Sequence, residues 1–153
     1  MKPQYWFVCG AILAALGVVN GAFGAHFLPQ NLPARYKTLT AEKELPQDEL
    51  DKLLTKRYAD YDTAVRYHMY HAFGLMLLGI VAAQRETHLW TAAGFCFFFG
   101  VIIFSGLLYA LVWTNRTILG AFVPIGGTMF VLGWVALAVG VWKHKIPIVG
   151  TTP

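Results

Sequence analysis

The sequence predicts an all-α integral membrane protein: a bundle of four membrane-spanning helices with an amphipathic helix in its long first loop. Of the 153 residues, 57% are hydrophobic and only 13% are charged, which is far from the composition of soluble globular domains. The apolar residues gather in four runs, 5–27, 63–83, 89–113 and 118–142. Each run reaches the roughly 20 residues that cross a ~30 Å hydrocarbon layer. Backbone groups in lipid must be hydrogen-bonded internally, so these runs are expected to be helices.

The length of 153 residues suits one domain, and we expect residues 1–153 to form a single transmembrane domain. The first run opens with the interfacial pair Tyr5-Trp6 close to Lys2. A secretory signal peptide is the alternative for this run, with cleavage near Ala22-Phe23-Gly24. We expect the segment to be retained as the first span.

Glycines recur along the first and fourth spans at steps of three, four or seven residues. Small residues at such spacing let the backbone of a second helix come close. The glycines predicted to pack against helices are Gly10, Gly17, Gly21 and Gly24 in the first span, and Gly133 and Gly140 in the fourth. Pro124, which is followed by two glycines, predicts a local kink in the fourth span.

The long first loop, residues 28–62, holds seven of the eight acidic residues. Its first part, 28–40, contains Pro29 and Pro33 and is expected to be an irregular strip. Its second part, 46–58, predicts a short amphipathic helix, because its leucines fall on one face and basic residues follow in the last turns. This helix would lie on the lipid interface, cap the end of the bundle, or be a solvated helix of mixed charge.

Polar residues of different spans are expected at one level of the membrane. If successive spans alternate in direction, several of these residues lie about 3 to 8 Å from the midplane, at ~1.5 Å per residue. Polar side chains within a membrane usually face the bundle interior and suggest a site. The candidate ligand-binding residues are Asn20, His26, Arg66, His68, His71, Ser105, Tyr109, Gly126 and Gly127. The alternatives for the cluster are interhelical hydrogen bonding, a small-molecule or lipid-headgroup pocket, and a metal or haem site.

A metal site has little support in the spacing. His68 and His71 diverge by about 60° around a helix of 3.6 residues per turn, and no carboxylate is expected at their depth. We therefore expect no metal and no cofactor. No nucleophile, phosphate-loop or metalloprotease motif is present, so no catalytic residue is predicted. The two cysteines, Cys9 and Cys96, are read as packing residues.

The net charge of +4 does not indicate nucleic acid, because the basic residues flank the spans as they do in membrane proteins. Lys2, Arg85, Lys143 and Lys145 lie on the side of the two termini. This distribution favours both termini in the cytoplasm.

Four stretches of the chain form a recognisable set: Gly21-Ala-Phe-Gly-Ala-His26, Thr63-Ala-Val-Arg-Tyr67 with Tyr70-His-Ala72, Phe104-Ser-Gly106 with Leu108-Tyr109, and Pro124-Ile-Gly-Gly127 with Gly133-Trp134. Together they resemble the transmembrane protein 256 family, also catalogued as domain of unknown function 423. The resemblance implies a small multi-pass membrane protein of bacteria or mitochondria, without an established activity. The chain departs from the family in having His68 where Gln is frequent, Leu107 where Ser is usual, and a longer segment around 46–58.

The predicted function is that of an accessory or self-associating membrane subunit, in contact with lipid and forming a homo-oligomer or part of a larger membrane complex. The alternative is a transporter or a small-ligand or lipid-binding protein that uses the polar cluster. A metal or haem redox protein is a third, more distant alternative. The predicted location is the bacterial inner membrane.

Overall fold

The computed structural model describes residues 2–41, 45–85 and 87–144, and within these residues the chain is helical with no strand. The helices are α1 (Pro3–His26), α2 (Leu28–Leu39), α3 (Gln47–Ala82), α4 (His88–Val101), α5 (Leu107–Thr114) and α6 (Ile118–His144). A π-helical turn, η2 (Ile102–Gly106), joins α4 to α5. These three elements form one continuous rod, called here the α4–α5 rod. Lys145, expected to flank the last span, lies outside the described residues.

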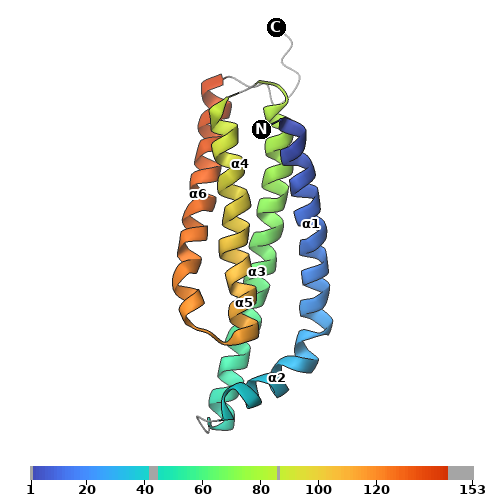
Figure 1. The fold of residues 1–153 in the computed structure, drawn as a ribbon, viewed down its shortest axis with the longest axis vertical. Coiled ribbons are helices and arrows are strands. Elements are labelled where there is room, and N and C mark those ends of the chain that lie inside the picture. The colour runs from blue at the N-terminus through green and yellow to red at the C-terminus, as the bar shows by residue number, and fades with distance from the viewer. Residues whose placement is uncertain (1, 42–44, 86, 145–153) are drawn as a thin grey trace.

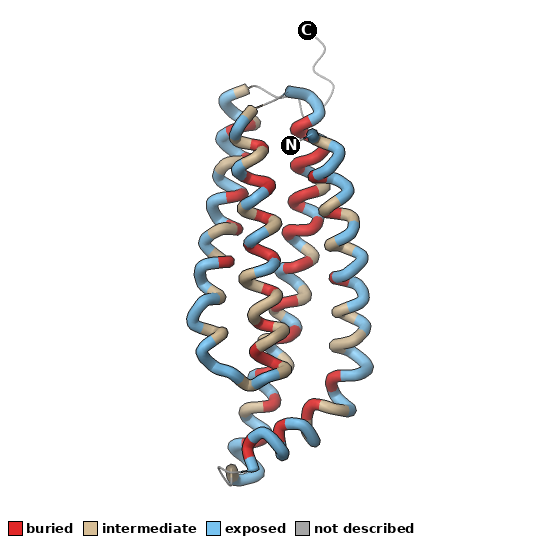
Figure 2. Tube along the Cα trace, viewed as in Figure 1, coloured by how far each residue is buried: buried red, intermediate tan, exposed pale blue. Residues whose placement is uncertain are grey.

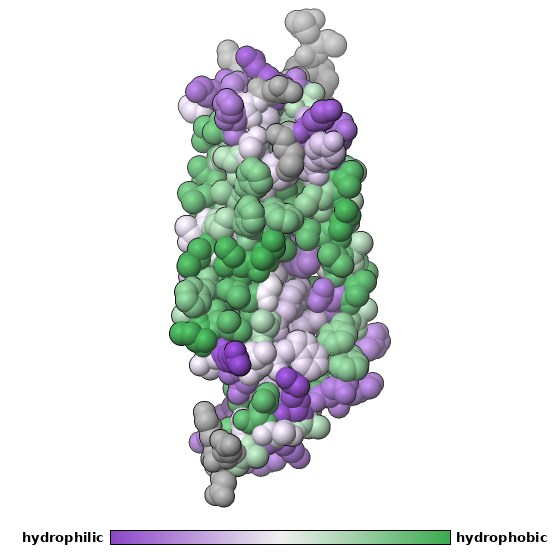
Figure 3. Space-filling view, viewed as in Figure 1, coloured by the Kyte–Doolittle hydropathy of each residue, from purple (hydrophilic) through white to green (hydrophobic). Residues whose placement is uncertain are grey.

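Four long helical rods run side by side, namely α1, α3, the α4–α5 rod and α6, while α2 crosses below the end of α1 (Figure 1). α1 packs mainly on α3, and α6 packs mainly on the α4–α5 rod. Among the described helices, three segments are long and apolar enough to cross a membrane: Pro3–His26, His88–Thr114 and Ile118–His144. The space-filling view shows an apolar belt between two hydrophilic ends (Figure 3).

The expectation of an irregular strip over residues 28–40 is wrong, because Leu28–Leu39 forms α2. Pro29 lies in the first turn, where a backbone N–H has no helical partner in any case. Pro33 removes only one further hydrogen bond near the same end. The buried residues Leu28, Leu32 and Tyr36 lie four residues apart on one face, and their burial stabilises a helix that local propensity alone disfavours.

The short helix expected over residues 46–58 is not separate from the second span. Both belong to α3, which runs without a break for 36 residues from Gln47 to Ala82. No proline or glycine occurs between Pro46 and Gly74 to end the helix. At ~1.5 Å per residue such a helix is about 54 Å long, so its first turns extend beyond the apolar belt and pack against α2.

The α4–α5 rod contains a departure from α-helical geometry that the sequence analysis did not predict, the π-helical turn of η2 at Ile102–Gly106. Such turns insert one extra residue per turn and often occur at functional sites. In α6, Pro124 lies within a helix that continues from Ile118 to His144.

The buried residues line the inner faces of the rods (Figure 2). They form two clusters. The cluster near the chain termini contains Trp6, Leu75, Leu78, Trp90, Phe97, Phe130 and Leu137. The cluster near the long loop contains Leu28, Leu32, Tyr36, Leu50, Leu54, Tyr61, Leu111 and Val112. The second cluster fixes α2 and the start of α3 against the end of α5.

The glycines singled out in the sequence face side chains or backbone of the same chain. A Cβ built at Gly10 would lie 2.6 Å from the Ala72 carbonyl oxygen of α3. Comparably close contacts occur between Gly17 and Met69, Gly24 and Tyr61, Gly133 and Phe97, and Gly140 and Trp90, whereas Gly21 is in ordinary contact with Val65 at 3.6 Å. These faces are therefore filled within the chain.

Gly126 and Gly106 provide a matched test of this packing. A Cβ at Gly126 would lie 2.5 Å from the Phe104 backbone nitrogen, whereas a Cβ at Gly106 would meet nothing within 4 Å. We expect Gly126→Ala to lower the free energy of unfolding by about 1–3 kcal/mol, and Gly106→Ala to leave it unchanged or raise it. Thermal unfolding in detergent, followed by circular dichroism, measures both. Equal melting temperatures for the two variants would contradict the packing described.

Candidate functional site

His71 has both ring nitrogens bonded within the chain. Its Nδ1 lies 2.7 Å from the Tyr67 carbonyl oxygen, and the Trp134 indole N–H donates to its Nε2 at 3.1 Å. Because Nε2 accepts from the indole, Nδ1 carries the proton and donates to the carbonyl oxygen. The ring also stacks on Phe130, with 3.4 Å between centroids. His71 therefore joins α3 to α6 and has no nitrogen left for a ligand.

Ser105, Gly126 and Gly127 lie in helix contacts. The Ser105 hydroxyl donates to the Ala64 carbonyl oxygen at 2.8 Å and joins η2 to α3. Both glycines face Phe104, the neighbour of Ser105. These three residues hold η2 between α3 and α6.

His68 differs from His71, one turn away, because one of its nitrogens has no partner. Its Nδ1 lies 3.4 Å from the Tyr109 hydroxyl oxygen. Its Nε2 is buried without a hydrogen bond, and the whole residue is only 5% exposed. The Leu13 backbone of α1 lies close enough to this ring for a weak hydrogen bond, although Nε2 has no partner within normal hydrogen-bond geometry. A buried polar atom without a partner is rare in proteins and requires an explanation.

Tyr61 and Asn20 extend this cluster towards α1. The Tyr61 hydroxyl donates to the Asn20 backbone carbonyl oxygen at 3.1 Å. The Asn20 side-chain amide donates to the Leu16 carbonyl oxygen of its own helix at 2.9 Å. The rings of Tyr61 and Tyr109 are neighbours, with centroids 5.0 Å apart. The structure thus brings together Asn20, Tyr61, His68 and Tyr109 from three rods.

This cluster lies between α1 and the α4–α5 rod, which make few close contacts with each other. The aromatic contacts that bridge the two rods lie towards their ends: Trp6 packs on Gly94 and Phe95, while Phe23 and Phe27 pack on Trp113. Between these contacts α1 packs on α3.

Gly106 opens this region, because a Cβ built there would meet nothing within 4 Å. It lies one turn before Tyr109 and two turns before Trp113 on the same stripe of the rod. Pale and purple atoms interrupt the apolar belt on this face, in the half nearer α2 (Figure 3). We call this region the lateral furrow, with α3 as its floor and α1 and the α4–α5 rod as its walls.

Two predicted site residues lie outside the furrow. His26 is exposed at the last residue of α1. Arg66 forms the expected ion pair with Asp62 at 2.8 Å, and the two side chains are 57% and 65% exposed.

Within the described residues, no group of three His, Cys, Asp or Glu side chains is arranged to hold a metal ion. His68 is directed to Tyr109 of α5, whereas His71 is directed to Trp134 of α6. The two histidines therefore face different rods and do not share a coordination site.

A polar clamp at the loop end was not found from the sequence, because its members come from three separate segments: α2, α3 and the end of α5. The Arg57 guanidinium donates to the Tyr36 hydroxyl oxygen, Asp60 and the Asn115 side-chain oxygen at 3.1, 3.0 and 2.8 Å. The Tyr36 hydroxyl in turn donates to the Val112 carbonyl oxygen at 2.8 Å. Burial raises the pKa of Tyr36, and the positive charge of Arg57 opposes the rise.

A carbonyl at the end of α5 receives a further bond, because Arg35 donates to the Trp113 carbonyl oxygen at 2.7 Å. The last carbonyl groups of a helix lack partners within it. The loop residues supply those partners, and the clamp fixes α2 and α3 against α5.

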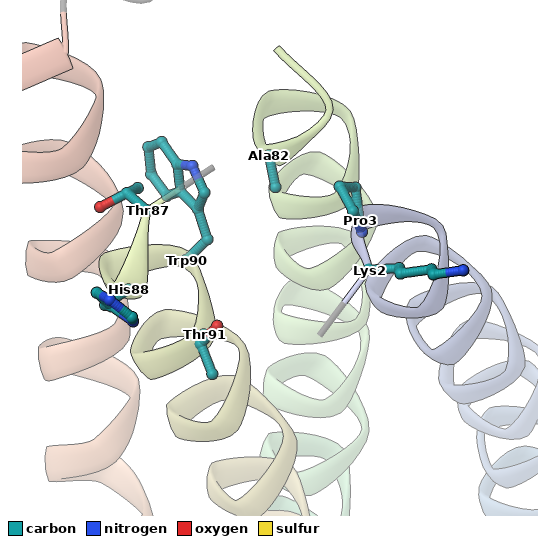
Figure 4. Close-up of a pocket in the computed structure, with 7 residues that line it drawn as sticks. All are labelled: Lys2, Pro3, Ala82, Thr87, His88, Trp90 and Thr91. Carbon is teal, nitrogen blue, oxygen red and sulfur yellow. The ribbon is translucent and has the colours of Figure 1, made fainter. Parts of the chain in front are cut away.

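The opposite end of the molecule contains a cavity of about 730 Å³ between the starts of α1 and α4 and the end of α3. It is lined by Lys2, Pro3, Ala82, Thr87, His88, Trp90 and Thr91 (Figure 4). The Lys2 side chain extends away from Trp90 and Thr87 in this view. The Trp90 indole N–H is already bonded to the Arg85 carbonyl oxygen at 2.6 Å. The polar groups of this cavity do not converge on one point.

The apolar belt and the three membrane-capable helices define a multi-pass, all-helical integral membrane protein. Residues 20–127 match the family model described as protein of unknown function (DUF423). The chain belongs to this family, which confirms the family indicated by the sequence motifs.

The curated relatives cover nearly the whole chain. The UPF0382 membrane protein YwdK of Bacillus subtilis is 35% identical over 142 residues, which are 92% of this chain and 98% of the relative. A UPF0382 membrane protein of Staphylococcus saprophyticus is 34% identical over 141 residues, again 92% of this chain and 98% of the relative. These relatives confirm the predicted location in a bacterial membrane. No solved structure matches the chain.

Two arginines of α3 test the clamp. The Arg57 side chain is 5% exposed and bonds three partners, whereas the Arg66 side chain is 57% exposed and pairs with one carboxylate. We expect Arg57→Gln to lower the free energy of unfolding by about 2 kcal/mol, because buried polar partners lose their hydrogen bonds. Arg66→Gln serves as the control and is expected to change it by less than about 0.5 kcal/mol. Denaturant unfolding in detergent measures the difference, and equal effects would show that the clamp does not stabilise the loop end.

Proposed function

We propose that the protein binds a small lipid-soluble molecule in the lateral furrow, between α1 and the α4–α5 rod. The single observation that carries this proposal is the buried Nε2 of His68, which has no hydrogen-bond partner. Leaving such an atom unpaired costs about 1–3 kcal/mol. A ligand that pairs with it offsets this cost in the bound state.

The walls of the furrow support entry from the lipid. Gly106 has open space in front of it, and Tyr109 and Asn20 are only partly buried. On α1, Gly17 is covered mainly by Met69 of α3, an unbranched side chain that adapts its shape easily. These features support entry of a molecule dissolved in the bilayer beside Tyr109 and Asn20.

The proposed topology has four crossings, with the second half of α3 as the second span. Its support is that α3 contacts α1, the α4–α5 rod and α6, and that both of its histidines are buried. Contact with the other rods shields the polar residues that lower its hydropathy. With Lys2, Arg85 and Lys143 at the end opposite the acidic loop, the proposed orientation places both termini in the cytoplasm.

The glycine faces, on which the prediction of an accessory or self-associating role was based, do not support that role. The glycine faces that would receive a second chain are already filled by side chains of this one. Self-association would have to use the outer faces of α1 and α6, whose exposed apolar residues are equally suited to lipid. The transporter alternative shares the lateral furrow and requires the binding proposed here as its first step.

The test is native mass spectrometry of the protein extracted from its host membrane in mild detergent. Wild-type protein is expected to retain one small lipophilic molecule per chain. Gly106→Leu places its Cβ in open space, extends a bulky side chain into the furrow, and is expected to lower the occupancy about tenfold, equivalent to ~1.4 kcal/mol. Ala121→Leu on the exposed side of α6 adds the same side chain elsewhere and should retain the molecule. Wild-type protein without an adduct, or equal occupancy in both variants, would refute the proposal.

A further inference from the structure

The geometry points to a ligand that presents a carbonyl oxygen, which accepts a hydrogen bond from the Nε2–H of His68. This inference rests on the proposed function, because it names the chemistry of the molecule that occupies the lateral furrow. It follows from the protonation of one imidazole ring and from the groups available around it.

The partner of Nδ1 determines which nitrogen of His68 carries the proton. A neutral imidazole has one donor nitrogen and one acceptor nitrogen. The Tyr109 hydroxyl lies 3.4 Å from Nδ1, and within the described residues no other acceptor is recorded for its proton. If Nδ1 were the donor, the phenol proton would be left unpaired in an apolar region. The phenol therefore donates to Nδ1, and the ring proton resides on Nε2.

The two histidines of α3 consequently carry their protons on opposite nitrogens. In His71 the indole of Trp134 donates to Nε2, which places the ring proton on Nδ1. In His68 the proton lies on Nε2, which makes no hydrogen bond of normal geometry within the described residues. The unpaired group in the furrow is thus an N–H donor, and it requires an acceptor.

The acceptor must come from an uncharged molecule. The furrow residues Asn20, Tyr61, His68 and Tyr109 carry no fixed charge, so an anion would lack a counter-charge in the hydrocarbon region. Uncharged acceptors that dissolve in lipid are chiefly carbonyl oxygens. The paired rings of Tyr61 and Tyr109, 5.0 Å apart, also provide a flat surface beside His68.

Two sources supply such a carbonyl oxygen: a quinone ring dissolved in the bilayer, and the acyl ester of a phospholipid. Both have the same hydrogen-bonding chemistry. They differ in whether they can be removed from a reconstituted membrane, because ether-linked phospholipids have no ester carbonyl group.

The test is nitrogen-15 NMR of histidine-labelled protein in nanodiscs of ether-linked phosphatidylcholine. The His68 signals are assigned by their loss in His68→Gln, and His71 serves as the internal control. We expect the His68 Nε2 resonance in the protonated range and the His71 Nε2 resonance in the unprotonated range. Replacing the lipid by ester-linked phosphatidylcholine, or adding decylubiquinone to the ether-linked nanodiscs, should shift the His68 Nε2 resonance and leave that of His71 unchanged. The arm that produces the shift identifies the source.

The variants provide a second readout. Gly106→Leu should abolish the shift, because it fills the furrow. In the native mass spectra, His68→Gln retains an N–H donor and should keep the adduct, whereas His68→Leu should lower its occupancy about tenfold. An unprotonated Nε2 in His68, or no shift with either carbonyl source, would overturn the inference. If the Gly106-dependent adduct persists without such a shift, the furrow still binds a ligand and only the carbonyl assignment fails.

Discussion

The need to pair polar groups away from water organises this molecule, and α3 is the helix on which those pairs meet. Tyr61 of α3 bonds α1, the Ala64 carbonyl oxygen receives Ser105 of η2, and His71 receives Trp134 of α6. An unpaired polar group is costly in an apolar environment, whereas each pair requires a particular neighbour at a particular height. These hydrogen bonds therefore specify which face of α3 each rod occupies.

Close packing completes what the hydrogen bonds specify. Aromatic side chains occupy the space left by glycines on the neighbouring helix, as Phe97 does at Gly133 and Trp90 does at Gly140. These contacts form within the chain, so they stabilise the fold and leave none of these glycine faces free for a partner. α1 differs because it packs mainly on one rod, α3. Its aromatic contacts with the α4–α5 rod lie near its two ends. The lateral furrow results from this incomplete coverage.

The arrangement of the rods explains why His68 and His71 differ in their hydrogen bonding. His71 has the same side chain as His68, the same helix and a comparable burial, yet every nitrogen of His71 is bonded. The furrow contains the one buried side-chain nitrogen or oxygen without a partner within the described residues. The π-helical turn of η2 ends at Gly106, one turn before Tyr109, and it sets the face on which these residues meet the furrow. The loop-end clamp around Arg57 holds the same end of α5 against α3.

The sequence by itself determined the class of protein, the family and the positions of the apolar runs, because composition and run length reflect directly whether a helix can lie in hydrocarbon. It also indicated that Asn20, His68, His71 and Ser105 lie inside, since polar residues within such runs are seldom directed to lipid. Only the tertiary structure decided which of them are satisfied, because a hydrogen bond depends on the neighbour and not on depth. The helical conformation of α2 was mispredicted because burial of Leu28, Leu32 and Tyr36 outweighs the local effect of its prolines, whereas the continuity of α3 agrees with the absence of proline and glycine between Pro46 and Gly74. The rotation of the rods against one another likewise decides which side chains fill the glycine faces, where the π-helical turn occurs and where the furrow lies. The spacing of residues along one helix does not encode that rotation.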